Sequence, residues 1–157
     1  MAISMPVRDQ SPRSTPAHST SAQSMPIEEA FLAVALAAVS WDGILTPAGT
    51  RALRHAIDYR SPSRELGEPR VALLINTVLE RLRERGAQHL MLEAAESLGS
   101  DLRRSAYAVA AEIMRSDGAL QPDESNILST LAATLELEDA DTEPVLAVME
   151  VLHAPVR

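Results

Sequence analysis

The sequence predicts an all-α protein, and three observations carry this prediction. From Ile27 onward, apolar residues recur at the spacing of an amphipathic helix, and no segment shows a convincing alternation of apolar and polar residues. Hydrophobic residues make up 46% of the 157 residues but aromatic residues only 3%, a composition typical of close-packed helices built from Ala, Leu, Val and Ile. Pro47, Gly86 and Pro122 stand between periodic segments, where helices begin and end. A chain of this length is expected to form one domain.

The chain divides near residue 25. Residues 1–25 are rich in Ser, Thr and Pro and show no apolar period, so they cannot bury enough surface to offset the entropy of ordering them. We expect a disordered tail over 1–25 and a helical domain over 26–157. The tail has neither the apolar stretch of a secretory signal nor the amphipathic helix of a transit peptide. Met25 is an alternative start of the functional chain.

The first three expected helices follow from apolar spacing and from residues that favour helix ends. Residues 27–40 are apolar almost all round, as is typical of a buried central helix, and this apolar run is far short of the roughly 20 residues of a membrane span. The second helix, 47–59, begins with proline behind the N-cap candidate Thr46. The third begins near Pro69 and ends at Gly86, which suits a helix end. Its expected inward residues are Val71, Leu74, Ile75, Val78, Leu79 and Leu82.

Four more helices are expected in the second half of the chain. They cover residues 87–98, a segment behind the N-cap candidate Ser100, a segment that begins at Pro122, and residues 142–153. The residues expected to face the core are Ala87, Leu90, Met91, Ala94 and Leu98; Leu102, Ala106, Val109, Ala110 and Ile113; Ile127, Leu128, Leu131 and Leu135; and Val145, Val148, Met149 and Leu152.

A short motif occurs twice, as SWDGILTP at residues 40–47 and as RSDGALQP at residues 115–122. An offset of 75 residues aligns Asp42 with Asp117 and also aligns the Gly, Leu and Pro of the two motifs. Apolar residues of the flanking helices match at the same offset. The chain is therefore expected to contain an internal pseudo-two-fold repeat of two helical hairpins.

Charge and composition restrict the partners. The formal net charge is −8 and all 14 basic residues are Arg, whereas phosphate binding needs a clustered excess of cations, so no nucleic-acid partner is expected. The chain contains no cysteine, which excludes disulfides, thiolate metal sites and cysteine nucleophiles. No apolar stretch is long enough for a transmembrane segment.

The segments AFLAVALAAVSWDGILTP, LRHAIDYRSP and AYAVAAEIMRSDGALQPDESNILSTLA resemble the tellurite-resistance TerB-like family, in particular its small cyanobacterial-type members. The resemblance covers about residues 26–153. It implies an all-helical bundle of about seven helices with internal pseudo-symmetry, a cytoplasmic protein and no known catalysis. It also implies a role in resistance to tellurite or other toxic agents, with acidic loop residues that hold divalent cations.

The second motif and the residues that follow it match part of the calcium loop of an EF-hand. With Gly118 at the sixth position, Asp117 falls at the fifth and Glu124 at the twelfth, as calcium coordination requires, but the first and third positions are an apolar residue and a cation. A site for calcium or another divalent cation would therefore use Asp117 and Glu124 with Asp123, and with Asp42 if the two loops meet. No cofactor is certain.

The same loops have a purely structural interpretation, which the sequence leaves open. Glycine can end one helix in a left-handed conformation, and proline can begin the next with its φ angle already set. Asp123 and Glu124 lie in the first turn of the following helix, where the helix dipole stabilises each carboxylate by roughly 0.3 to 1 kcal/mol without an ion.

Two further groups are candidates for interaction with a protein partner. Trp41, the only tryptophan, lies beside the first Asp-Gly pair and would mark an interface if exposed. Arg81, Arg83 and Arg85 form a basic point that could dock an acidic partner. The alternative for these arginines is a solvated helix face with local pairing to the neighbouring glutamates.

The resemblance therefore implies a non-enzymatic, TerB-like stress-response protein that acts through protein partners and could bind a divalent cation at its acidic loops. The alternative is an ion-independent helical adaptor, in which the Asp-Gly loops only shape the fold. An enzyme is a more distant alternative, because it would need coupled carboxylates in a pocket, such as Glu112 near Asp117.

Overall fold

The computed structural model describes residues 24–41, 46–60 and 62–156, which form seven α-helices, one short 3-10 helix and no strand. The all-α fold with seven helices is confirmed. The α-helices are α1 (Ile27–Val39), α2 (Pro47–Tyr59), α3 (Glu68–Arg85), α4 (Ala87–Ser97), α5 (Ser100–Arg115), α6 (Pro122–Thr134) and α7 (Asp139–Leu152), and the 3-10 helix η1 (Ser63–Glu65) follows α2. Residues 1–23 of the expected tail lie outside the described residues.

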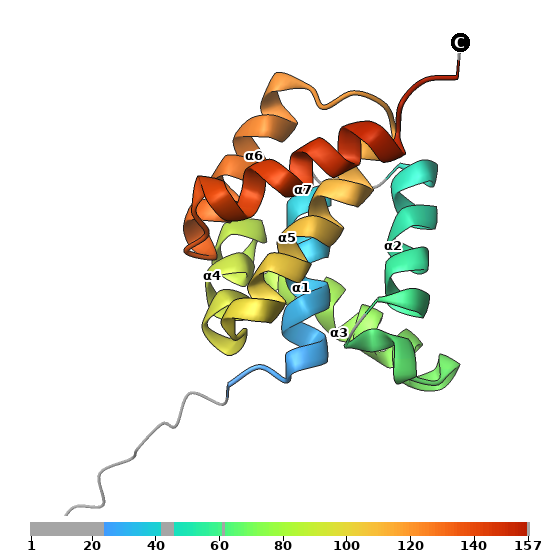
Figure 1. Cartoon of the computed structure of the whole chain (residues 1–157). Helices are drawn as coiled ribbons and strands as arrows, with labels where there is room; N and C mark the ends of the chain where they lie inside the picture. Colours follow the sequence, from blue (N-terminus) through green and yellow to red (C-terminus); the bar gives the residue numbers. More distant parts are fainter. Residues whose placement is uncertain (1–23, 42–45, 61, 157) are drawn as a thin grey trace, which may run out of the picture.

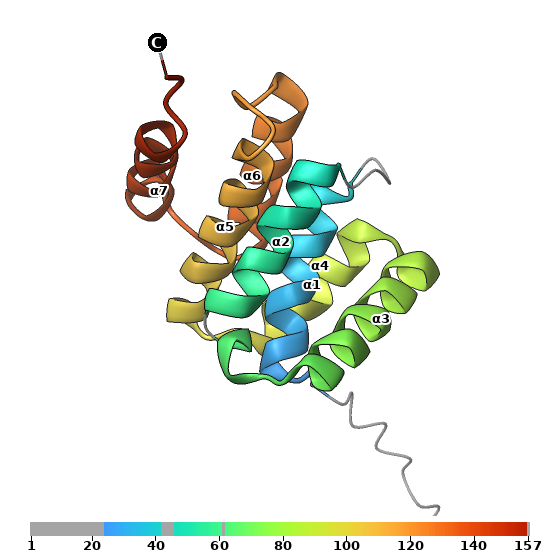
Figure 2. The ribbon, with the colours of Figure 1, turned by 90° about the vertical axis from the view of Figure 1, so that its right-hand side faces the viewer.

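Helix α1 lies at the centre of the fold, and α4 and α5 pack against it most extensively (Figure 1). Helices α2, α3 and α6 also contact it, so α1 is enclosed from several directions. Figure 2 shows that α7 lies on the far side of α5 from α1. Helix α7 packs mainly against α5, and its opposite side is left open.

The sequence of α1 explains its central position. Every residue from Glu29 to Ala38 is buried, as expected for a helix that is apolar almost all round. The alanines of this segment have short side chains that let neighbouring helices approach closely, while Phe31 and Leu36 fill the space between them. The core already includes Met25, just before the helix begins.

The ends of several helices follow the local sequence. Thr46 caps α2 because its side-chain oxygen accepts a hydrogen bond from the backbone N–H of Gly49 at 3.0 Å, and proline occupies the first turn. Gly86 ends α3 with φ of 80°, a conformation that strongly favours glycine. The helix predicted from Pro69 begins one residue earlier, with the proline at its second position. These backbone requirements made the boundaries readable from sequence.

Two other starts differ from the prediction. Gly99 is the N-cap of α5 and Ser100 is already its first helical residue, so the expected serine cap is wrong. Helix α7 begins at Asp139, three residues before the predicted start at 142. Its first turn is polar, so apolar spacing missed it. The Asp141 carboxylate accepts a hydrogen bond from the backbone N–H of Glu138 at 3.2 Å and stabilises this earlier start.

The predicted inward face of α7 is only partly correct. Met149 is buried and Val145 is partly buried, but Val148 and Leu152 are 52% and 63% exposed. Helix α7 meets the rest of the protein mainly through α5, so the strip that it can bury is narrow. The predicted core residues of α6, by contrast, are confirmed, because Leu128, Leu131 and Leu135 are buried and Ile127 packs partly against the core.

Arg103 joins the C-terminal ends of two helices. Its guanidinium donates hydrogen bonds to the backbone oxygens of Ala95 and Leu98, at the end of α4, at 3.0 and 2.8 Å. A third hydrogen bond of 3.3 Å reaches the backbone oxygen of Leu135, at the end of α6. Carbonyls at helix ends lack partners within their own helix, so one planar side chain satisfies groups from both helices.

The spans of α2 and α6 are offset by the same 75 residues as the Asp-Gly motifs, since Pro47–Tyr59 and Pro122–Thr134 are equally long. This agreement concerns helix bounds only, and the pseudo-two-fold arrangement stays a prediction.

None of the described helices is both long enough and apolar enough to cross a membrane.

Candidate functional site

The second Asp-Gly turn connects α5 to α6 through backbone hydrogen bonds and a helix cap. The N–H of Gly118 donates to the carbonyl of Arg115 at 3.1 Å, and Gly118 has φ of 131°, which a residue with a side chain rarely adopts. Glu124, in the first turn of α6, reaches back so that its carboxylate accepts the backbone N–H of Gln121 at 2.7 Å. This capping bond gives Glu124 a structural function.

A side-chain hydrogen bond ties the start of α2 to this turn. The hydroxyl of Thr46 donates to the Asp117 carboxylate with 2.6 Å between the oxygens, although the two residues are 71 positions apart. The same hydroxyl oxygen caps α2 by accepting the N–H of Gly49. The end of the first motif therefore lies beside the second motif, which was the condition for Asp42 to join the predicted cation site. Asp42 itself lies outside the described residues.

A hollow of about 470 Å³ opens beside this contact. Its lining includes the three predicted metal ligands of the second motif, Asp117, Asp123 and Glu124, and the predicted interface residue Trp41, which is 37% exposed. Apolar side chains from three helices form another part of the lining: Ala38, Val39, Ile113, Met114 and Ile127. Four residues that the sequence singled out for two different reasons thus belong to one site.

The described residues do not assemble a complete metal site. Across the described ranges, no group of three or more His, Cys, Asp or Glu residues is arranged to hold an ion. Two of the predicted ligands also make hydrogen bonds within the chain, Asp117 with Thr46 and Glu124 with the backbone of Gln121. The third, Asp123, is exposed in the first turn of α6. The prediction of a cation site therefore stays a prediction.

Two polar residues of the hollow, Asn126 and Thr130, were not among the predicted site residues, and both belong to α6. Their positions could have been found, because residues 123, 126, 127 and 130 follow the spacing of one helix face. The second function of Thr46 could not have been found in this way, because its contact with Asp117 depends on how α2 and α5 are placed in space.

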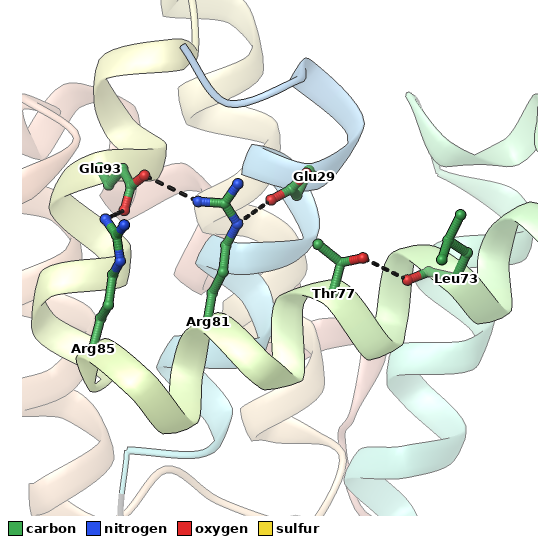
Figure 3. A network of polar contacts seen from close by, with 6 residues as sticks. All are labelled: Glu29, Leu73, Thr77, Arg81, Arg85 and Glu93. Carbon is green, nitrogen blue, oxygen red and sulfur yellow. Dashed lines mark hydrogen bonds and ion pairs between the residues drawn. The ribbon is translucent and has the colours of Figure 1, made fainter. Parts of the chain in front are cut away.

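The basic point on α3 has a different environment from the one predicted. Arg81 lies 2.5 Å from a Glu29 carboxylate oxygen of α1 and 3.2 Å from a Glu93 oxygen of α4 (Figure 3). Arg85 donates to the other oxygen of Glu93 at 2.7 Å. These two arginines therefore pair across helices and not with their neighbours Glu80 and Glu84, so the expectation of local pairing is wrong for them. Arg83 is exposed.

This network fixes α3 to the centre of the fold. Glu29 is buried, and its oxygen Oε1 contacts Arg81 as an ion pair without the geometry of a hydrogen bond. A carboxylate that is removed from water needs such a cation nearby. Arg81 and Arg85 thus form ion pairs within the protein, so they are weaker candidates for binding an acidic partner.

The residues proposed for the enzyme alternative are engaged separately. Glu112 accepts hydrogen bonds from the Arg60 guanidinium at 3.0 and 3.3 Å, which links α5 to the residue after α2. The Asp117 carboxylate accepts a hydrogen bond from the Thr46 hydroxyl.

No protein-family model, curated protein or solved structure matches the chain. The TerB-like resemblance therefore rests on the sequence motifs alone.

Proposed function

We propose that the chain is a non-enzymatic helical module of the TerB-like, stress-response kind, and that it acts by binding a protein partner at the hollow beside the second Asp-Gly turn. The observation that carries this proposal is the composition of the hollow, which combines an apolar lining, an exposed tryptophan and acidic side chains. Binding sites in proteins commonly join apolar surface with a few well-placed polar groups.

The hydrogen bonds around the hollow support a binding function. The bond between Thr46 and Asp117 holds the start of α2 against the turn after α5, and the capping bond of Glu124 fixes the start of α6. A partner would therefore meet walls that are already ordered, which lowers the entropy lost on binding. Trp41 would supply the kind of aromatic contact that dominates many interfaces.

The charge of the hollow indicates the chemistry of the partner. Asp117, Asp123 and Glu124 are all acidic, and the whole chain has a net charge of −8. Such a surface favours a segment with Lys or Arg, because complementary charge speeds encounter and excludes acidic competitors. The cationic group could also stack on the Trp41 ring. We therefore propose a basic segment with an apolar part as the partner.

A mutation series in a binding assay tests this proposal. The full-length chain is immobilised and proteins retained from an extract of the source cells are identified. We expect Trp41→Ala and Asp123→Arg to lose a partner that the wild type retains. Leu73→Ser, which changes an exposed leucine on α3, should keep that partner. Equal retention by the wild type and both hollow variants would refute binding at this site.

A divalent cation is the second candidate ligand, and one observation favours it. Asp117, Asp123 and Glu124 line the same hollow. They are not arranged to hold an ion as the structure stands, so an ion would have to draw them together, with water or backbone oxygens as further ligands. In this form of the proposal, the cation would adjust the surface that the partner recognises. The ion would compete with Thr46 for the Asp117 carboxylate.

Thermal unfolding with EDTA, calcium and magnesium separates the two candidates. An ion bound only by the folded state adds about 2.7 kcal/mol at one hundred times its Kd, which raises Tm clearly. Glu124→Gln is a suitable variant because glutamine removes the charge and still supports the cap. A rise in the wild type that Glu124→Gln and Asp123→Asn abolish supports the cation. An unchanged Tm in all three proteins supports the ion-independent adaptor.

The stress-response part of the proposal needs a cellular test. The resemblance implies a cytoplasmic protein that contributes to resistance against tellurite or another toxic agent. A strain that lacks the protein should grow poorly with tellurite and recover with the wild-type chain but not with Trp41→Ala. Equal growth of all strains across toxic agents would reject this role while leaving the binding assay unaffected.

A further inference from the structure

Helix α7 is joined to the rest of the described chain mainly through α5, and it buries few residues there. Of its 14 residues, only Thr142 and Met149 are buried, while Val145 and Leu146 are partly buried. Helix α1, with 13 residues, is buried along nearly its whole length. Hydrophobic stabilisation grows with the apolar area removed from water, so α7 is held more weakly than α1.

Two ion pairs, one toward each end of α7, also connect it to α5. Arg104 Nη1 lies 3.2 Å from Asp141 Oδ1, and Arg115 Nε lies 3.1 Å from Glu150 Oε1. Both positions of a pair rise together along the sequence, so the two helices run in the same direction (Figure 1). The Arg104 and Glu150 side chains are 57% and 62% exposed, so water and salt weaken both pairs. We call these two contacts the α7 ion pairs.

The face of α5 between the two arginines is the face that α7 covers. Ala111 lies about two turns after Arg104 and about one turn before Arg115, so the three residues share one side of the helix. Ala106 and Ile113 follow the spacing of the opposite side, which faces α1 (Figure 2). Ala111 is 0% exposed, as is Ala106. The burial of Ala111 therefore depends on α7, whereas that of Ala106 depends on the central helix.

The chain just before α7 is fixed to the rest of the fold. Leu135 is buried, and the N–H of Leu137 donates a hydrogen bond to the carbonyl of Ala132 in α6 at 2.9 Å. Only Glu138 stands between this fixed end and the first residue of α7. Helices α1 to α6 can therefore keep their contacts when α7 leaves α5.

The helical conformation of α7 depends on its contact with α5. A helix of this length is marginal in water without tertiary contacts. Pro144 lies inside α7 and lacks the N–H that would bond to the preceding turn, which weakens the isolated helix further. Departure of α7 from α5 is therefore a local unfolding, which exposes the backbone amides of α7 together with the side of α5 that it covered.

We propose that α7 is a releasable cover, which opens as one unit while α1 to α6 stay folded and so uncovers the Ala111 side of α5. Opening also separates Arg104 and Arg115 from their carboxylates, which makes the uncovered side cationic. Salt weakens the α7 ion pairs, so the opening equilibrium responds to ionic strength. The hollow is lined from α1, α2, α5, α6 and the turns beside them, so this inference does not depend on the proposed function.

Thiol labelling of single-cysteine variants tests the opening, because the chain contains no native cysteine. Ala111→Cys lies under α7, and Ala106→Cys is the matched control at an equally buried position of the same helix. We expect Ala111→Cys to react about tenfold faster or more, because local opening requires less free energy than global unfolding. Circular dichroism checks that both variants are folded.

Hydrogen exchange of the full-length wild-type chain gives a second measure that needs no substitution. Amides in the middle of α7, from position 145 to 149, should exchange faster than those of α1. They should also share one opening free energy, because α7 opens as a unit. A steady slowing from the ends of α7 toward its middle would instead show fraying and would contradict the proposal.

Variants of the α7 ion pairs test their control of the opening. In the Ala111→Cys chain, Arg104→Gln and Glu150→Gln should each speed labelling about twofold to fivefold, the range expected for partly exposed ion pairs. Arg83→Gln and Glu143→Gln remove the same charges at exposed positions and should leave the rate unchanged.

Three further outcomes would overturn the proposal. The first is equal labelling of the two cysteine variants, and the second is exchange of the α7 amides as slow as that of α1. The third is labelling of the ion-pair variants no faster than that of their charge-matched controls.

Discussion

Helices α1 and α7 are the two most apolar helices of the described chain, yet their environments are opposite. Helix α1 is enclosed by α2 to α6 and buries every residue from Glu29 to Ala38. Helix α7 rests on α5 and buries Thr142 and Met149, while three of its large apolar residues remain exposed. The difference shows that apolar content decides how much surface a helix can bury. The number of neighbouring elements decides how much it does bury.

Each of the two helices is also held by an Arg–Glu ion pair, and the two pairs differ in which member is buried. In α1 the carboxylate of Glu29 is buried and its partner Arg81 is partly exposed. In α7 the partner Arg115 is buried and the carboxylate of Glu150 is 62% exposed. A buried charge depends on its partner, whereas an exposed charge retains water. Each anchor should therefore respond most strongly when the exposed member is removed.

The largest difference between the two helices should come from shortening a core residue. Leu36→Ala in α1 removes a side chain that is only 1% exposed, and we expect a loss of about 2 to 5 kcal/mol in unfolding free energy. Val151→Ala in α7 should stay within about 0.5 kcal/mol. Urea denaturation at low protein concentration measures both values. Similar losses at the two positions would contradict the described burial of α1.

The anchor of α1 should give the next largest effect. Arg81→Met removes the cation nearest to the buried Glu29 carboxylate, with an expected loss of about 1 to 3 kcal/mol. The loss is limited because the Arg81 side chain is 31% exposed. Arg83→Met, at an exposed position of the same helix, is the control and should be nearly neutral. A double variant with Glu29→Gln should recover part of the loss, and additive losses would argue against the pair.

The anchor of α7 should give a smaller effect. Glu150→Ala leaves the buried Arg115 guanidinium without its carboxylate, and we expect a loss of about 0.5 to 2 kcal/mol because water can approach from the side that Glu150 occupied. Glu143→Ala on the same helix serves as the control. If Glu150→Ala and Glu143→Ala lower the unfolding free energy equally, the pair of Arg115 and Glu150 does not stabilise the contact between α5 and α7.

The smallest effect concerns α5, the helix between the two, and is confined to alkaline solution. Burial raises the pKa of Tyr107 above its ordinary value of 10.0. The unfolded chain therefore loses this proton at a lower pH than the folded chain, so stability falls as pH rises above about 10. We expect Tyr107→Phe to reduce this fall, measured by urea denaturation across alkaline pH. Tyr59→Phe, at an exposed position, should leave it unchanged.

The parts of the fold that could be predicted are those that the local backbone dictates. Pro47, Gly86 and Pro122 set helix boundaries through restricted or unusual φ angles, and the apolar run of α1 indicated a central helix. The exposed side of α7 could not be predicted, because the spacing of apolar residues shows which face of a helix is apolar but not whether another helix covers that face. The polar start of α7 was missed for the related reason that it carries no apolar period.

The candidate site could be predicted as residues but not as an arrangement. The repeated motif identified Asp117, Asp123 and Glu124, and Trp41 was noted for its rarity, and all four line the hollow. The bond between Thr46 and Asp117 joins positions 71 residues apart, and such pairs depend on the angles at which helices cross. The partners of Arg81 were mistaken for the same reason.

The hydrogen bonds of Arg103 have a consequence for local opening of the fold. One guanidinium binds carbonyls at the ends of both α4 and α6, so fraying of either end gives up hydrogen bonds to the side chain that also holds the other end. The amide protons at these two ends should therefore exchange with solvent as one cooperative unit. A lysine at position 103 could not make the same set of hydrogen bonds, because its ammonium lacks the planar fork of donors that reaches several carbonyls at once. In a chain whose cations are all arginine, the two helix ends are coupled through a single side chain.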